Sequence, residues 1–170
     1  MLRALGACLL TAGAGAAGWC AADRLRRRVR GLRAMLEALE LAERELSFRL
    51  TPMPKLLDEL SRRTPPPVRP FFARCREGLD RLGTQSLGEI WQTALEECPM
   101  ELSGEDLETV AALGQVLGRY DGEGQREALC LARSRLAHLL EEAERDRDSR
   151  GRLYRTLGLT AGGFFGILLL

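Results

Sequence analysis

The sequence has little of what catalysis and metal binding require. It contains one histidine, His138, and one lysine, Lys55, in 170 residues. A single histidine excludes metal sites built on several histidines. The lone lysine lies in PMPKLL, so there is no G-x-x-x-x-G-K-[ST] phosphate loop. Between Ala137 and Leu139 on an expected helix, His138 fits a partly exposed packing residue better than a catalytic base. We therefore expect no enzyme activity, no metal and no cofactor.

Signals for disulfides and for strands are also weak. The cysteines show no metal-ligand spacing, and a reducing compartment needs no disulfide framework. No stretch shows sustained alternation of apolar and polar residues, so no strand is expected. The five cysteines, which we expect to be small packing residues, are Cys8, Cys20, Cys75, Cys98 and Cys130.

Positive charge is scarce in most of the chain and concentrated at its ends. Residues 1–33 and 145–170 hold 12 arginines against 3 acidic residues, a balance of +9. Residues 34–144 hold 13 cationic residues against 21 acidic ones, a balance of −8. A nucleic-acid-binding protein carries basic charge over its folded body or along a docking helix. An acidic body between basic ends therefore disfavours nucleic acid as a partner.

An uncharged, mostly apolar run of 19 residues extends from Ala4 to Ala22. As a helix it would measure about 28 Å, close to the hydrocarbon thickness of a bilayer, about 30 Å. A cleaved signal peptide carries its positive charge in front of the apolar stretch. Here only Arg3 precedes the run and six arginines follow it. We therefore expect residues 1–22 to form a retained transmembrane helix.

The chain ends in a second uncharged run of 15 residues, 156–170, which is about 22 Å of helix and short for a span. The aliphatic stem of Arg155 can extend the run while its guanidinium reaches the interface. A buried C-terminal helix of a soluble domain is the alternative, but such a helix normally keeps a polar face. We expect a transmembrane helix that packs through a stripe of small residues. The stripe consists of Gly158, Gly162 and Gly166.

Both apolar runs carry their arginines on the side that faces the middle of the chain. Positive charge near the end of a span stays on the cytoplasmic side of the membrane. Both clusters therefore predict that residues 23–155 are cytoplasmic and that both termini lie outside. The same side chains can contact anionic lipid headgroups. They are Arg24, Arg26, Arg27, Arg28, Arg30 and Arg33 after the first run, and Arg145, Arg147, Arg150, Arg152 and Arg155 before the second.

The body of the chain has the pattern of helix almost throughout. From Leu25 to Leu46, apolar residues recur at steps of three and four, which predicts a long helix that ends near Leu50. Thr51 is then a candidate N-cap for a helix from Pro52 to Arg63. Four more helices are expected. The first buries Phe71, Phe72, Cys75, Leu79 and Leu82 and ends at Gly83. The next two are opened by a capping box of Ser86 and Glu89 and by Ser103 with Asp106, and the last runs from Gln125, after the turn-like DGEG at 121–124, into the second apolar run.

The first and last helices of the body are expected to pair as two antiparallel rods. The segments 23–50 and 125–152 each have 28 residues, roughly 42 Å of helix, and their apolar stripes match. The short helices would pack around the ends of the rods that lie far from the membrane. The expected fold is all-α: a helical bundle on two long antiparallel helices, with a transmembrane helix at each end. Its domains are 1–22, 23–155 and 156–170.

Rods of equal length place Thr51 and Asp121 at the same height, about 40 Å from the membrane. The TPMP and RYDGEGQ turns would then meet at this distal pole, where a cytoplasmic partner first makes contact. Helix capping and turn geometry explain the same residues about equally well. The candidate partner interface consists of Thr51, Pro52, Gly118, Tyr120, Asp121, Glu123 and Gln125.

The order and spacing of several motifs resemble the stage III sporulation protein AB family. They are the arginine cluster after an apolar run, LTPMP at 50–54, SLGEIW at 86–91, LGRYDGEGQ at 117–125 and the apolar terminal helix. Together they cover essentially the whole chain. The resemblance implies an all-helical cytoplasmic domain similar to the F-type inner-membrane platform domains of type II secretion and type IV pilus machines. The chain departs from many relatives in using arginine for lysine, which preserves the charge.

The resemblance also implies a function. It implies a non-enzymatic membrane platform, required for endospore formation, in the secretion-like channel between mother cell and forespore. The implied partners are the AAA-type ATPase stage III sporulation protein AA, other channel subunits and membrane lipids, with no small-molecule substrate. The chain would belong to an oligomeric complex in the mother-cell membrane that surrounds the forespore. A generic membrane-anchored helical adaptor of a secretion-type machine is the alternative.

Overall fold

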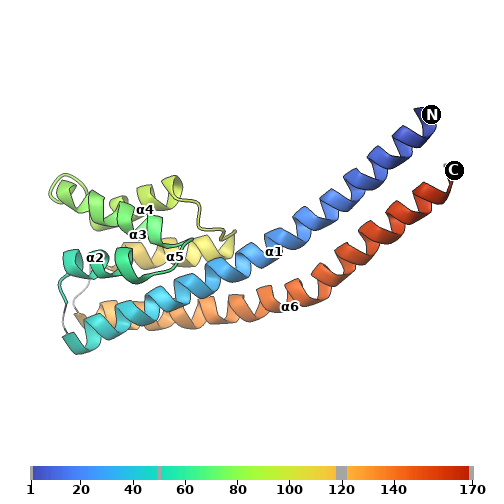
Figure 1. Ribbon diagram of the computed structural model, residues 1–170. Coiled ribbons are helices and arrows are strands. Elements are labelled where there is room, and N and C mark those ends of the chain that lie inside the picture. Colours follow the sequence, from blue (N-terminus) through green and yellow to red (C-terminus); the bar gives the residue numbers. More distant parts are fainter. Residues whose placement is uncertain (1, 50, 118–121, 169–170) are drawn as a thin grey trace. The chain divides into compact units, whose positions relative to one another are not determined.

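The structure, a computed structural model, describes residues 2–49, 51–117 and 122–168. Within its helices it does not describe the side chains of residues 2–12, 14, 15, 49, 122, 150–155, 157–159 and 161–168. These described residues form helices and no strand, which confirms the predicted all-α class (Figure 1). The elements are α1 (Leu2–Arg49), α2 (Met53–Arg63), α3 (Arg69–Gly78), the 3₁₀-helix η1 (Leu79–Arg81), α4 (Leu87–Glu97), α5 (Glu105–Leu117) and α6 (Gly122–Leu168).

The chain divides into two compact units, and both long helices contribute to each. Residues 30–141 form the central unit, and residues 1–29 together with 142–170 form the terminal unit. Both α1, of 48 residues, and α6, of 47, pass from one unit to the other without a break. The prediction that the last helix of the body continues into the C-terminal apolar run is therefore confirmed.

In the central unit, the segments of α1 and α6 lie side by side and run antiparallel (Figure 1). An ion pair joins them, with Nη1 of Arg133 on α6 2.7 Å from Oε2 of Glu43 on α1. Both helices bury apolar side chains at steps of three and four, as their sequence pattern predicts. The buried residues include Leu32, Met35, Leu39 and Ala42 on α1, and Leu129, Ala132, Leu136 and Leu139 on α6.

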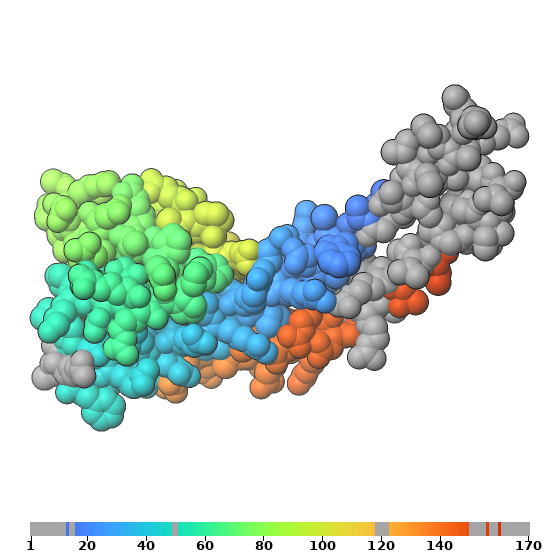
Figure 2. Space-filling model, in the orientation of Figure 1, coloured from blue at the N-terminus to red at the C-terminus, as the bar shows by residue number. Residues whose placement is uncertain are grey.

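The short helices of the central unit pack around an aromatic cluster. Phe71 and Phe72 of α3 lie against Trp91 of α4, with ring centroids 4.8 and 6.1 Å from the indole, and all three contacts in the cluster are edge-to-face. At the surface, the guanidinium of Arg74 on α3 donates to the carboxylate of Glu97 on α4. The space-filling view shows the short helices as one continuous surface (Figure 2). Edge-to-face rings in a buried cluster add packing specificity to the hydrophobic gain.

Local helix signals were predicted well at two N-termini. Ser86 caps α4 with a complete capping box, because its hydroxyl accepts from the Glu89 N–H while the Glu89 carboxylate accepts from the Ser86 N–H. Before α5, the backbone N–H of Ser103 donates to Oδ2 of Asp106 over 3.1 Å. Asp106 is fully buried at this helix start, where its negative charge also suits the positive end of the helix dipole.

Other boundaries differ from the prediction. α3 ends at Gly78, η1 follows, and Gly83, with φ +115°, comes after a short turn in a conformation that suits glycine. Leu82 was predicted to face inward but is 49% exposed, because the helix has ended before it. α6 begins at Gly122, three residues before the predicted Gln125. Gly122, Glu123 and Gly124 thus belong to the first turn of the helix, with the acid Glu123 favoured at its N-terminus.

The terminal unit consists of α1 up to residue 29 and α6 from residue 142. Ala22, Val29 and Ala143 are buried in it. Most side chains of the two predicted spans, 1–22 and 156–170, lie outside the described residues. Among the residues that are described, none of the helices has a stretch both long and apolar enough to span a membrane.

Candidate functional site

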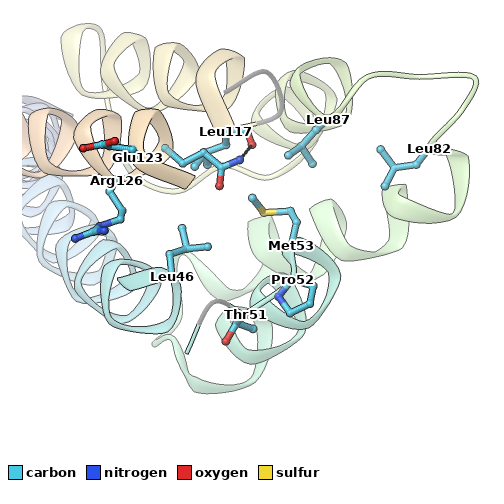
Figure 3. A pocket seen from close by; sticks show the side chains of 10 residues that line it. Leu46, Thr51, Pro52, Met53, Leu82, Leu87, Leu117, Glu123 and Arg126 are labelled. Carbon is cyan, nitrogen blue, oxygen red and sulfur yellow. Dashed lines mark hydrogen bonds between the residues drawn. The ribbon is translucent and has the colours of Figure 1, made fainter. Parts of the chain in front are cut away.

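A pocket of about 640 Å³ opens in the central unit where the ends of several helices converge (Figure 3). The turn from α1 into α2 lines one wall, and the start of α6 with the last residue of α5 lines another. The loop between η1 and α4 also contributes. The lining residues are Leu46, Thr51, Pro52, Met53, Leu82, Leu87, Leu117, Glu123, Gln125 and Arg126. We call this site the distal pocket.

Thr51 holds the turn between α1 and α2 in place. Its backbone N–H donates to the carbonyl of Glu45 over 3.2 Å, and its hydroxyl donates to Oε2 of Glu45 over 3.0 Å. Both residues are only 6% exposed. The prediction that Thr51 caps the next helix is therefore wrong. Pro52 is the N-cap of α2, and its carbonyl accepts from the N–H groups of Lys55 and Leu56. The threonine hydroxyl is engaged by a buried carboxylate on the preceding helix.

Gln125 ties the start of α6 to the end of α5. Its side-chain amide donates to the carbonyl of Leu117 over 2.9 Å, which satisfies one of the carbonyls left open at a helix C-terminus. Gln125 therefore has a structural role while also lining the distal pocket. The bond fixes the two helix ends that form this wall.

The distal pocket has an apolar interior and a charged rim. Leu87 and Leu117 are buried, and Leu46 and Met53 are half-buried in its walls. Glu123 and Arg126 are exposed at its edge. Leu82, 49% exposed, adds apolar surface at the entrance. Such a combination suits an apolar side chain of a partner, with charged groups around it for orientation.

The structure brings together four of the seven residues predicted as a partner interface: Thr51, Pro52, Glu123 and Gln125. The other three, Gly118, Tyr120 and Asp121, lie outside the described residues. Sequence reasoning missed Leu46, Met53, Leu82, Leu87, Leu117 and Arg126 as lining residues. For the leucines and Met53 the only sequence signal was their apolar character, which favours an inner face but does not reveal where that face stays open. Arg126 gave no such signal.

The arginines predicted to set topology take part in local ion pairs where the structure describes their partners. Nη1 of Arg27 lies 2.6 Å from Oδ2 of Asp23, and Nη2 of Arg30 lies 3.9 Å from Oε2 of Glu101. Arg147 pairs with Asp148 over 2.9 Å, and the pKa of Arg147 is raised by its hydrogen bond to that carboxylate. Arg24, Arg26 and Arg145 are exposed and Arg28 is half-buried. The side chains of Arg150, Arg152 and Arg155, and the packing of Gly158, Gly162 and Gly166, lie outside the described residues.

Candidate metal ligands do not cluster in the described part of the chain. No three histidine, cysteine or acidic side chains come together there in a way that could hold a metal ion. His138 is exposed on α6. The distal pocket contains one carboxylate, one guanidinium and one amide on an otherwise apolar lining that also includes the Thr51 hydroxyl. This lining offers an apolar binding surface with a few polar groups at its edge.

The described residues form an all-helical protein in which a bundle of short helices is built on two long ones, with the distal pocket where the helix ends converge. The family model described as stage III sporulation protein AB (spore_III_AB) matches residues 3–170, and the chain belongs to that family. The resemblance found in the sequence motifs is thereby confirmed, and membership implies a role in sporulation.

Individual relatives agree with this assignment. Stage III sporulation protein AB of Bacillus subtilis (strain 168) is 25% identical over 172 residues, which cover 100% of both chains. A solved structure of stage III sporulation protein AB (SpoIIIAB) is similar to this fold with a TM-score of 0.65 at 25% identity. The similarity covers 72% of this chain and 98% of the solved one.

Proposed function

We propose that the chain is a non-enzymatic membrane platform of a sporulation complex, and that its distal pocket binds a cytoplasmic ATPase of the stage III sporulation protein AA type. The observation that carries the proposal is the convergence of the TPMP turn with the start of α6 on one open pocket. The sequence independently predicts these two turns to be farthest from the membrane.

Membrane anchoring is supported by the ends of the chain. Arginine clusters flank both apolar runs on the inner side, which favours a cytoplasmic central unit and termini outside. The described side chains of the first run include Ala16 and Ala17, which are exposed, and Trp19, which is 70% exposed. Exposed apolar side chains without a polar face suit lipid, and tryptophan is favoured at the membrane interface. The membrane that we propose is that of the mother cell around the forespore, where other channel subunits assemble.

The chemistry of the distal pocket defines what the ATPase must offer. An apolar or aromatic side chain would enter between Leu46, Met53 and Leu87. Beside it, a basic group would meet Glu123 and an acidic group would meet Arg126. Because these two rim residues are exposed, they would contribute orientation and association rate more than affinity. Most of the binding energy would come from the apolar side chain and from covering Leu82.

The proposal is tested by capture of the ATPase from a sporulating lysate on the full-length chain in membranes. Leu82→Asp places a charge at the apolar entrance, and Glu123→Arg with Arg126→Glu exchanges the two rim charges. Both variants alter exposed residues, so the thermal unfolding temperature should stay near that of the wild type. We expect each to reduce capture at least tenfold and to lower spore yield.

A matched control changes the same charges elsewhere. Glu96→Arg on α4 and Lys55→Glu on α2 alter exposed residues that do not line the distal pocket. These two substitutions should leave capture unchanged. Wild-type capture by both pocket variants, with folding intact, would rule out the distal pocket as the ATPase site.

A further inference from the structure

A second apolar groove lies in the central unit between α5 and α6. It encloses about 320 Å³, a volume larger than that of one phenylalanine side chain. Leu131, 71% exposed, and the exposed Ala112 lie on its surface, and Glu108 and Arg135 provide charge at its edges. None of its lining residues belongs to the distal pocket. We call it the α5–α6 groove.

The outer face of α1 carries an unusual knob near its end. Phe48 is 85% exposed, the largest exposed fraction among the large apolar residues that the structure describes. Arg44 and Glu40 follow it on the same face, since positions one turn apart on a helix lie above one another, and both are exposed. No ion pair involves either side chain within the described residues. A full aromatic side chain in water is a characteristic anchor for a partner surface.

Two ion pairs relate the three helices along their common direction. The pair between Glu43 and Arg133 fixes the antiparallel register of α1 and α6. The pair between Glu105 and Arg135, 3.0 Å apart, fixes the register of α5 and α6. Because all three helices rise by the same amount per residue, the order and spacing of residues along α1 can be compared with those along the groove.

Along this common direction the outer face of α1 and the α5–α6 groove carry features in the same order, about one turn apart. On α1, Phe48 is followed by Arg44 and then by Glu40. In the groove, the apolar Ala112 is followed by the acidic Glu108 and then by the basic Arg135, which also pairs with Glu105 of its own chain. The two surfaces are therefore complementary in the order of their apolar and charged groups.

We infer that the α5–α6 groove receives the outer face of α1 from a second copy of this chain. Copies held in one membrane share one orientation, so the two series of features run in the same direction in neighbouring copies. This common direction rests on the membrane anchoring proposed above, whereas the matching of charge and shape does not. Because two different faces meet, the contact is heterologous and leads to a ring or an open row of copies.

The contact can be mapped by photo-cross-linking of the full-length chain in membranes. A benzophenone analogue of phenylalanine at position 48 keeps the aromatic knob and reacts with whatever covers it. We expect a product of twice the chain mass, joined to residues 105–135 of the other copy. A product with a different protein, or none, would overturn the inference.

Charge reversal tests whether the charges on the outer face of α1 pair with those of the groove. Arg44→Glu and Glu108→Arg should each lower the cross-linked product roughly threefold or more, because each places like charges opposite one another. The two changes together in one chain should restore it, since every contact then again pairs opposite charges. Phe48→Ala should reduce co-purification of two differently tagged copies roughly tenfold or more. The double reversal failing to restore the product would also overturn the inference.

Two controls separate this contact from the ATPase site. Lys55→Glu reverses an exposed charge outside both surfaces and should not change the cross-linked product. Leu82→Asp should preserve the product while removing capture of the ATPase. If the wild-type chain fails to capture the ATPase but the cross-linked product forms, the ATPase proposal is wrong and the self-association stands. If the ATPase is captured but no product forms, the self-association is wrong and the ATPase proposal stands.

Discussion

The indole of Trp91 on α4 lies directly against Gly114 on α5. Its Nε1 donates to the carbonyl of Val110, one turn earlier on α5, over 2.9 Å. A β-carbon built on Gly114 would overlap Cγ and Cδ1 of the indole ring. The absence of a side chain at this position therefore lets the two helices approach closely enough for the hydrogen bond. This hydrogen bond joins α4 to α5.

Adding one methyl group at this contact should destabilise the protein. We expect Gly114→Ala to lower the free energy of unfolding by about 1–3 kcal/mol, because the Trp91 ring is fully enclosed and the helices must separate. Denaturant unfolding of the purified chain measures it. Gly88→Ala is the matched control: there the nearest atoms belong to the end of the exposed Gln115 side chain, which can move away. That variant should be neutral or gain up to about 1 kcal/mol from helix propensity. Equal effects of the two substitutions would contradict the packing argument.

Sequence reasoning could locate much of the α4–α5 contact but not its geometry. The capping box of Ser86 and Glu89 correctly placed the start of α4, the helix that carries Trp91. The need for glycine at position 114 comes from a neighbour 23 residues away in the chain. No local pattern carries that information. The same limit applies to Leu82, which continued the apolar stripe of α3 after the helix itself had ended.

The distal pocket illustrates a second limit. The sequence predicted that the TPMP turn and the start of α6 would meet, and the described residues of both do line one pocket. It assigned Thr51 to helix capping because a threonine before a proline-rich turn is a common N-cap. In the structure the Thr51 hydroxyl donates instead to the buried carboxylate of Glu45. Local propensity could not reveal this, since it depends on how the chain folds back onto α1.

The bond from Thr51 to Glu45 should contribute measurably to stability. Thr51→Val keeps the shape of the side chain but removes one donor from a buried carboxylate. We expect a loss of about 1–3 kcal/mol in the free energy of unfolding, the range found when a buried polar group loses a partner. Thr93→Val, on the surface of α4, removes a hydroxyl that only donates to the carbonyl of Glu89 in its own helix. Its effect should stay within about 0.5 kcal/mol. A Thr51 variant as stable as the Thr93 one would show that the turn holds without this bond.

The capping box of α4 should make stability depend on acid pH. The pKa of Glu89 is lowered below its ordinary value of 4.5, first by the backbone N–H of Ser86 and then by its hydroxyl. A carboxyl group with a lowered pKa in the folded state contributes stability above its ordinary pKa and loses it as pH falls through the folded one. The stability difference between the wild type and Glu89→Gln should therefore be constant near neutrality and shrink below about pH 4.5. Unfolding curves at a series of pH values measure it. A difference that does not change with acidification would exclude a role for the Glu89 charge.

Cysteine accessibility offers the sharpest test of membrane topology, and the structure identifies which thiol to use. Cys75 is fully buried, and burial raises its pKa well above the ordinary thiol range, so it should not react in the folded chain. Cys130 on α6 is exposed. With Cys8, Cys20 and Cys98 replaced by serine, an impermeant maleimide applied to intact vegetative cells expressing the chain should label nothing. After permeabilisation it should label Cys130 alone, and after denaturation Cys75 as well.

The matched control reports on the opposite side of the membrane. Leu2→Cys, in a chain whose other exposed thiols are replaced by serine, should be labelled in intact cells, because the arginine clusters predict that the N-terminus lies outside. Together the two thiols distinguish three arrangements. Labelling of residue 2 but not Cys130 in intact cells is the expected result. Labelling of Cys130 would reverse the orientation, and protection of both until permeabilisation would mean that the first apolar run does not cross. The last outcome would remove the shared membrane anchoring on which the side-by-side arrangement of copies depends.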